Sequence, residues 1–196
     1  MVSQVQEKPA APAPPPVADL AANLPPGVDF EAALRAPLFK GLSPEQIREF
    51  LMIGTPKKYA AGEVVIREGD TDTDMYILLR GHLNITKKIP PVVQGSKEQQ
   101  KTLFEPEVPK MMGMFAFGEM NLLAGLGRST SVTAVEESDT LVITKESFDA
   151  LCERDARLGY VMTRNIAQTI VTNLIATNGR VAKLTLVLTL ALQKRA

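Results

Sequence analysis

Short apolar segments with the two-residue alternation of β-strands fill the middle of the chain, and turn residues separate them. Glycine stands in two of these turns, at residues 68–70 and 80–81. Short strands at this spacing are typical of a small antiparallel barrel or sandwich. The sequence therefore predicts an α+β, mainly β fold, with strands at residues 63–66, 75–79, 82–86, 131–135 and 140–143.

Helix-start signals stand on both sides of the predicted strands. Ser43 precedes a proline and is followed by Gln46, which is the pattern of a capping box with proline in the first turn. Thr144 occupies a capping position before a helix expected at residues 146–152. We therefore expect an N-terminal helix before the barrel and C-terminal helices after it.

Three segments differ in composition from the predicted barrel. Seven of the 14 prolines fall in the first 26 residues, so we expect residues 1–28 to form a disordered Ala/Pro-rich tail without a helix. Residues 87–112 are long for a hairpin connection and are predicted to be a surface excursion, with two strands continued past a flexible tip. Residues 29–178 would be the folded domain, and residues 179–196 an apolar C-terminal helix or tail.

The C-terminal region has a helical apolar stripe that begins near residue 157. Asn178 followed by Gly179 is predicted to bend or end this helix. Residues 181–192 are then unusually apolar, and a monomer would expose more contiguous apolar surface than soluble proteins usually tolerate. The pattern predicts a homodimer or a larger protein assembly through the C-terminal helices.

Charge and composition exclude several classes of function. The 22 basic residues balance 22 acidic ones, which argues against non-specific nucleic-acid binding and against a polybasic membrane anchor. With one cysteine and one histidine, the chain has no intramolecular disulfide, no cysteine zinc site and no multi-histidine metal site of its own. No apolar run approaches the ~18 residues of a membrane span, and the N-terminus does not resemble a secretory signal. We expect a cytoplasmic protein without a metal site or prosthetic group.

The stretch 117–129, which reads Phe-Gly-Glu-Met-Asn-Leu-Leu-Ala-Gly-Leu-Gly-Arg-Ser, carries the chemistry. Gly118 allows close backbone approach, and residues 119–124 can form a short helix whose free amides attract an anion. Arg128 then supplies a forked, permanently charged donor that suits phosphate. Glu119 is an acceptor that suits a ribose hydroxyl. Together these groups predict a cradle for a sugar phosphate.

This stretch resembles the phosphate-binding cassette of cyclic-nucleotide-binding domains, the family of the catabolite activator protein, kinase regulatory subunits and cyclic-nucleotide-gated channels. The strands at residues 62–70 and 75–83 and the segment 141–148 resemble the same family in order and spacing. Two positions depart from the family pattern, because Asn121 and Gly127 stand where small apolar residues and proline are often found. The resemblance covers roughly residues 37–178 and implies a jelly-roll-like β-barrel with a short cassette helix.

The resemblance also implies roles for individual residues. Glu119 would accept a hydrogen bond from the ribose 2′-hydroxyl, and Arg128 would pair with the cyclic phosphate. Gly118, Glu119 and Ser129 would offer backbone amides, and the Ser129 hydroxyl a further bond. In the family the helix after the barrel covers the base. The expected ligand-binding residues are therefore Gly118, Glu119, Arg128, Ser129 and, on that helix, Thr172 and Asn173.

Two hypotheses for function follow. The first is a non-enzymatic sensor that binds a cyclic nucleotide, cAMP or cGMP, and signals through its C-terminal helices to a partner or by dimerisation. The alternative is a scaffold or interaction protein that uses a ligand-free form of the fold in a larger assembly. An enzyme has little support, since no nucleophile–base pair accompanies the cassette. Only 18 residues follow Asn178, too few for a helix-turn-helix, so we expect no direct DNA binding.

Overall fold

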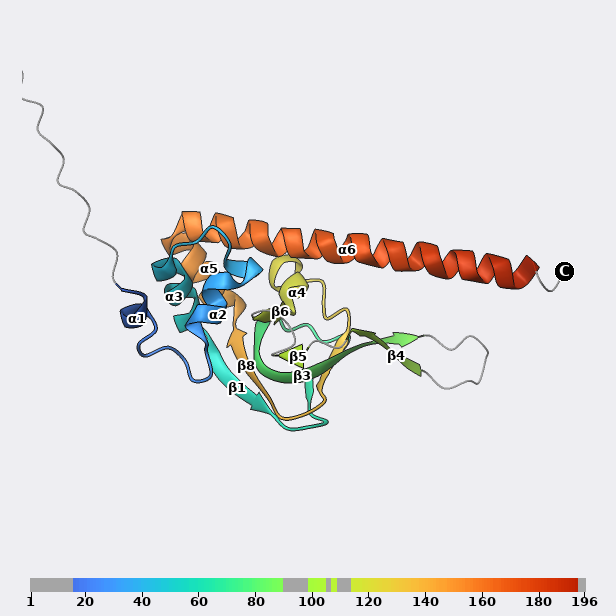
Figure 1. The fold of residues 1–196 in the computed structure, drawn as a ribbon, viewed down its shortest axis with the longest axis horizontal. Helices are drawn as coiled ribbons and strands as arrows, with labels where there is room; N and C mark the ends of the chain where they lie inside the picture. Colours follow the sequence, from blue (N-terminus) through green and yellow to red (C-terminus); the bar gives the residue numbers. More distant parts are fainter. Residues whose placement is uncertain (1–15, 90–98, 105–106, 109–113, 194–196) are drawn as a thin grey trace, which may run out of the picture.

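The computed structural model describes residues 16–89, 99–104, 107–108 and 114–193. Within them, a sheet of eight antiparallel strands curls into a half-barrel, and a long helix lies along one side of it (Figure 1). The helices are α1 (Val17–Leu20), α2 (Phe30–Arg35), the 3₁₀ helix η1 (Pro37–Phe39), α3 (Pro44–Met52), α4 (Glu119–Ala124), α5 (Lys145–Arg154) and α6 (Ala156–Gln193). The strands are β1 (Thr55–Tyr59), β2 (Val64–Ile66), β3 (Met75–Ile89), β4 (Gln99–Phe104), β5 (Glu107–Val108), β6 (Phe115–Phe117), β7 (Ser131–Ala134) and β8 (Ser138–Ile143).

Strand β3 is the centre of the sheet. The hydrogen-bonded order is β1-β8-β3-β7-β2, and β4, β5 and β6 also pair with β3 at different points along its 15 residues. The turn predicted at residues 80–81 is wrong, because β3 runs continuously through it. Gly81 has a φ of +106°, and a Cβ there would lie 2.3 Å from the Ser138 hydroxyl oxygen, so glycine lets the strand continue with a shift in register.

Two apolar clusters form the core. One lies between the sheet and the helices α2, η1, α3, α5 and α6, and contains side chains such as Phe50, Leu141 and Met162. The other lies within the barrel around Leu83 and Phe117. The capping predictions are confirmed: Ser43 and Gln46 form a capping box at α3, and the Thr144 hydroxyl accepts from the Ser147 amide at α5.

The N-terminal prediction is wrong for part of its range. Residues 17–20 form helix α1, and Leu20 is buried in the larger apolar cluster, although the segment was expected to hold no helix. Proline fixes backbone angles that suit the start of a helix, so a short turn directly after Pro16 is compatible with a proline-rich segment. Residues 1–15 lie outside the described residues.

The excursion predicted at residues 87–112 begins as a hairpin. Strand β3 continues to Ile89 and pairs with β4, so the expectation of two continued strands is confirmed, while the predicted tip lies outside the described residues. The division of the chain at residues 28 and 178 stays a prediction.

Helix α6 is one continuous helix of 38 residues. The predicted break at Asn178 and Gly179 is wrong, because α6 runs through both. A glycine inside an exposed helix costs about 1 kcal/mol relative to alanine, which is too little to end a helix whose neighbours favour it. Over the residues described, no helix combines the length and the apolar character that crossing a membrane requires.

Candidate functional site

The short helix α4 begins at a glycine that no other residue could replace without strain. Gly118 has a φ of +77°, and a Cβ on it would lie 2.8 Å from the Arg128 Nη1 and 3.1 Å from the Asp74 carbonyl oxygen. The missing side chain lets the backbone of α4 lie directly against the guanidinium. The sequence prediction of a helix at residues 119–124 is confirmed.

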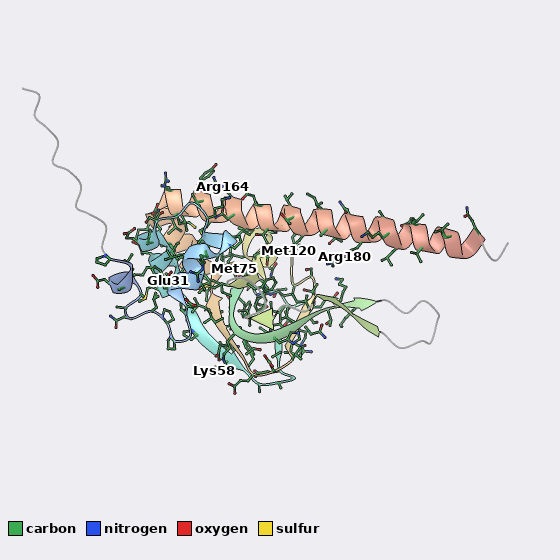
Figure 2. All side chains as sticks on the ribbon, viewed as in Figure 1. Glu31, Lys58, Met75, Met120, Arg164 and Arg180 are labelled. Atoms are coloured by element: carbon green, nitrogen blue, oxygen red, sulfur yellow. The ribbon has the colours of Figure 1, made fainter. Side chains whose placement is uncertain are left out.

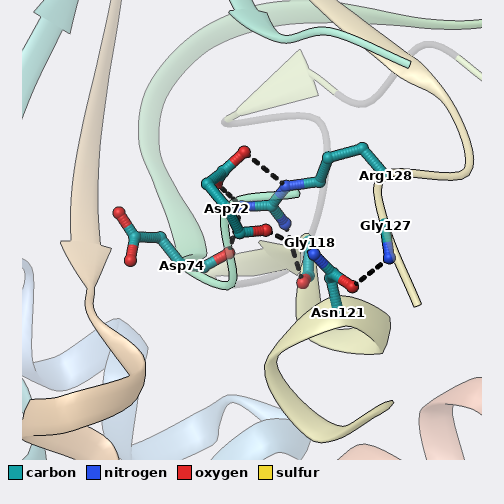
Figure 3. A network of polar contacts seen from close by, with 6 residues as sticks. All are labelled: Asp72, Asp74, Gly118, Asn121, Gly127 and Arg128. Carbon is teal, nitrogen blue, oxygen red and sulfur yellow. Dashed lines mark hydrogen bonds and ion pairs between the residues drawn. The ribbon is translucent and has the colours of Figure 1, made fainter. Parts of the chain in front are cut away.

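Arg128 lies at the centre of a buried polar network (Figure 3). Its side chain is 2% exposed, and its Nε and Nη2 donate to the two carboxylate oxygens of Asp72, the Nε bond being 3.1 Å long. Nη1 donates to the Gly118 carbonyl at 3.1 Å, and Nη2 also donates to the Asp74 carbonyl at 2.7 Å. A guanidinium has five N–H groups, and these four bonds leave one of them for a ligand.

Asp72 was not predicted from the sequence. It stands in the loop between β2 and β3, and its side chain is 45% exposed while that of its partner is almost fully buried. This ion pair therefore joins a buried cation to a carboxylate that still contacts water. Arg128 also lies over the ring of Tyr76, with its central carbon 5.6 Å from the ring centroid, and burial raises the pKa of the Tyr76 phenol to about 12.

Two carboxyl groups near the guanidinium have perturbed acidity. Glu119 is 9% exposed, and burial raises the pKa of its carboxyl, while its own backbone amide and Arg128 oppose the rise. Burial and the neighbouring Asp72 likewise raise the pKa of Asp74. Glu119 thus presents a partly desolvated acceptor at the start of α4, a few ångströms along the backbone from the Gly118 carbonyl that Arg128 binds.

A cavity of about 630 Å³ opens between this network and α6. The barrel, the cassette and the middle of α6 each supply part of its wall, and Figure 2 labels Met120 on α4 and Arg180 on α6, which both line it. Most of the lining is apolar, while the polar side chains come from the cassette and from one face of the helix. The residues on that face are Asn173, Ala176, Thr177, Arg180, Val181 and Leu184.

The structure brings most of the predicted site residues together. Gly118, Glu119, Arg128 and Ser129 all line the cavity, and so does Asn173 from α6. Thr172 is not among the described lining residues, and its hydroxyl instead donates to the Gln168 carbonyl of its own helix at 2.9 Å.

Sequence reasoning missed two groups of lining residues. Thr177 and Arg180 follow Asn173 at helical spacing, so extending the helix face from Asn173 would have found them. Asn121 lies within the cassette and also lines the cavity. Its side chain is buried, with the residue 3% exposed, and its position in the motif did not indicate this.

The fold and the cavity together define a half-barrel domain with a cavity large enough for a small ligand, which α6 helps to line. The family model of the cyclic nucleotide-binding domain matches residues 56–155, and the chain belongs to that family. The confirmed predictions are the family and the fold class, which is mainly antiparallel sheet with helices.

Relatives of known identity share the fold and parts of the sequence. The chain is 29% identical over 119 residues to the cyclic AMP receptor protein of Thermus thermophilus, covering 61% of this chain and 50% of that protein. The crystal structure of the Thermus thermophilus catabolite activator protein superposes with a TM-score of 0.62 at 26% identity, over 76% of this chain and 63% of that one. The cAMP-bound regulatory domain of Toxoplasma gondii PKA gives a TM-score of 0.51 at 26% identity, over 62% and 42%. The chain thus spans about half the length of the first of these proteins.

Proposed function

We propose that this chain is a non-catalytic regulatory protein that binds a cyclic nucleotide in the cavity between the cassette and α6. The observation that carries the proposal is Arg128, an almost fully buried cation that lines a cavity of nucleotide size in a member of this family. Besides its bonds to Asp72 and to backbone carbonyls, the guanidinium has one N–H left, and a cyclic phosphate is an anion that matches its planar fork. A cytoplasmic location is part of the proposal.

Each polar group of the cradle has a role in the proposed complex. Arg128 pairs with the phosphate, and the amides of Gly118, Glu119 and Ser129 surround it. The Glu119 carboxylate accepts from the ribose 2′-hydroxyl. The base then lies toward α6, where Asn173 and Thr177 present hydrogen-bonding groups to the cavity.

Binding of a phosphate requires Arg128 to give up part of its internal hydrogen bonding. One N–H of Arg128 is left by its four internal bonds, so a two-pronged contact with phosphate requires that at least one of them be released. Asp72 is the partner that water solvates best, because its side chain is 45% exposed. We therefore expect the phosphate to take over one of the two Arg128 N–H groups that bond to Asp72, while the other bond to Asp72 remains and keeps the guanidinium oriented.

The proposed ligand is cAMP. The Thermus thermophilus relative is named for cyclic AMP, and the Toxoplasma gondii domain was solved with cAMP, which supports this choice. cGMP is the competing ligand, and the human relative named cGMP-dependent protein kinase 2 is 24% identical over 131 residues. The test compares both.

The proposed output runs through α6. The segment from residue 171 exposes large apolar side chains on several sides, and a helix with this property is normally covered by another protein surface. We propose that ligand in the cavity fixes this segment in one arrangement, which then binds a second copy or a partner protein. The exposed side chains are Val171, Leu174, Ile175, Val181, Leu184, Leu186, Val187 and Leu190.

A scaffold function is the second candidate, and one observation favours it. Four of the five N–H groups of Arg128 already have internal acceptors in Asp72, Asp74 and Gly118, so the fold satisfies most of its buried cation without any ligand. A domain of this kind serves equally as a building block of an assembly.

Thermal unfolding with cAMP, cGMP or AMP separates the two candidates. A ligand at about 100 times its dissociation constant adds roughly 2.7 kcal/mol, which is a shift of about 5–10 °C for a chain of this size. The sensor proposal expects that shift with cAMP, a smaller one with cGMP and none with AMP. Unchanged melting with every nucleotide would overturn it in favour of the scaffold.

A further inference from the structure

Asn121 is a buried polar side chain on α4 that bonds to two separate loops (Figure 3). Its Oδ1 accepts from the Gly127 amide at 2.7 Å, and its Nδ2 donates to the Asp72 carbonyl oxygen. Both bonds are to backbone groups, so the amide acts as a bridge between the loop before Arg128 and the loop that carries Asp72.

The bond to Gly127 depends on what that residue is. Gly127 has a φ of +88°, a conformation that L side chains rarely adopt, and its N–H is the donor that Asn121 uses. Proline at this position would supply neither the angle nor the donor. The bond between Asn121 and Gly127 therefore needs both residues: the amide oxygen of Asn121 is the acceptor, and Gly127 supplies the N–H in a conformation that suits glycine.

Asn121 also acts on both members of the Asp72–Arg128 ion pair. It bonds to the backbone of Asp72, whose carboxylate binds the guanidinium, and it bonds to the residue directly before Arg128. The backbone of Arg128 is fixed in turn, since its N–H donates to the Asp70 carbonyl at 2.7 Å and its carbonyl accepts from the Gly69 amide at 2.9 Å. Without the Asn121 side chain, the two loops keep these backbone contacts but lose the hydrogen bonds that join them beside the ion pair.

We propose that Asn121 is a positioning residue, which sets cyclic-nucleotide affinity by holding Arg128 and Asp72 in place before the ligand arrives. The inference rests on the proposed function. A cation that is already oriented loses less freedom on binding, so a preorganised site binds more tightly than a loose one. Asn121 makes no contact with phosphate in this scheme and acts through Arg128.

The test is calorimetric titration of cAMP into wild type, Asn121→Ala and Asn165→Ala. Asn165 is a matched control, because it is also a buried asparagine, 4% exposed, whose Nδ2 donates to two backbone carbonyls, those of Leu38 and Lys40. Both variants leave buried polar groups unpaired and should melt at lower temperature. Asn121→Ala should also lose about 10-fold in affinity, while Asn165→Ala stays within about 2-fold of wild type.

A double-mutant cycle distinguishes positioning from general loosening. Lysine cannot reproduce the two-pronged contact with Asp72, so in an Arg128→Lys background Asn121→Ala should change affinity by less than about 2-fold. A full 10-fold loss in that background overturns the inference, and so does wild-type affinity in the single Asn121→Ala variant. If that variant does not fold, Asn121→Asp keeps an oxygen acceptor but loses the donor to Asp72, and wild-type affinity there overturns it as well. Wild type that binds no cyclic nucleotide overturns the proposed function itself.

Discussion

The two halves of α6 differ completely in their surroundings although they form one helix. In the first half, Leu158, Met162 and Ile166 are at most 1% exposed and pack into the larger apolar cluster. Asn165 anchors the same half by donating to the Leu38 and Lys40 carbonyls. From Val171 onward, every residue whose burial is described is exposed.

This difference assigns separate tasks to the two halves. The first half belongs to the domain, since its buried side chains contribute to folding. The second half is exposed where its burial is described, and Asn173 and Thr177 on it line the cavity together with residues of the cassette. A ligand in the cavity and a partner on the exposed side chains therefore act on the same segment, and this couples the two in the proposed mechanism.

The largest expected effect on affinity comes from removing Arg128, which lies on the side of the cavity formed by the domain. Arg128→Ala removes the buried cation, and the loss of one partner of such a charge pair costs about 2–5 kcal/mol, or roughly 30-fold to several thousand-fold in cAMP affinity. Calorimetry measures it. Arg80→Ala is the control, because Arg80 also pairs with two carboxylates, Glu137 and Asp139, but its side chain is 57% exposed. Equal affinity in wild type and Arg128→Ala would place the site elsewhere.

Removal of residues 181–196 tests the other side of the same cavity. Val181 and Leu184 line the cavity, and the loss of their apolar contacts should weaken cAMP binding about 10-fold. Among the α6 residues whose burial is described, the buried ones all precede residue 171, so the melting temperature without ligand should change little. Sedimentation should show a smaller assembly or loss of a bound partner. A truncated chain with unchanged mass and affinity would remove any role for the second half.

Much of the fold could be predicted because its signals are local. The caps at Ser43 and Thr144 and the alternating strands around Leu83 are readable from a few neighbouring residues. Strand β1 gave no such signal, since Tyr59 is its one buried residue and the rest of the strand is exposed. Its place is set by pairing with β8, which no local pattern contains.

The residues of the candidate site also differ in whether the sequence alone could identify them. Arg128 and Glu119 stand in one contiguous motif, so the residue pattern was sufficient to select them. Asp72 lies 56 residues before its partner, and only the folded chain brings its carboxylate to the guanidinium. The uninterrupted α6 was missed for the opposite reason: the local signal at Gly179 was read as a break, although the helix runs through it.

A smaller effect concerns the ribose side of the cavity and its dependence on pH. Burial raises the pKa of the Glu119 carboxyl, so the folded chain takes up this proton more readily than the unfolded one. The contribution of Glu119 to stability therefore rises as pH falls through the raised pKa, while affinity for cAMP falls there, because the protonated carboxyl is a weaker acceptor.

Glu119→Gln tests directly whether stability and cAMP affinity change in opposite directions with pH. An amide oxygen still accepts from the ribose, so affinity near neutral pH should fall only about 2- to 10-fold, less than for Arg128→Ala. Both trends with pH should weaken in the variant, as measured by calorimetry and thermal unfolding across the acidic range. Glu136→Gln, at an exposed position, should keep the wild-type trends. An unchanged pH profile in Glu119→Gln would assign the titration to another group.

The smallest expected effect compares the two halves of α6 through one substitution. Gly159 and Gly179 both lie inside the helix, and alanine favours a helix over glycine by about 1 kcal/mol at either position. At Gly159 the new Cβ would lie 2.8 Å from the Cys152 Cβ and 3.1 Å from its Sγ, and such overpacking costs about 1–3 kcal/mol. At Gly179 nothing lies within 4 Å. Gly159→Ala should therefore lower the melting temperature, while Gly179→Ala lies in the half that contributes little to domain stability and should leave it within about 1 °C, with an increased helical circular dichroism signal. A melting temperature of Gly159→Ala that is no lower than that of Gly179→Ala would show that the packing contrast between these two positions does not control stability.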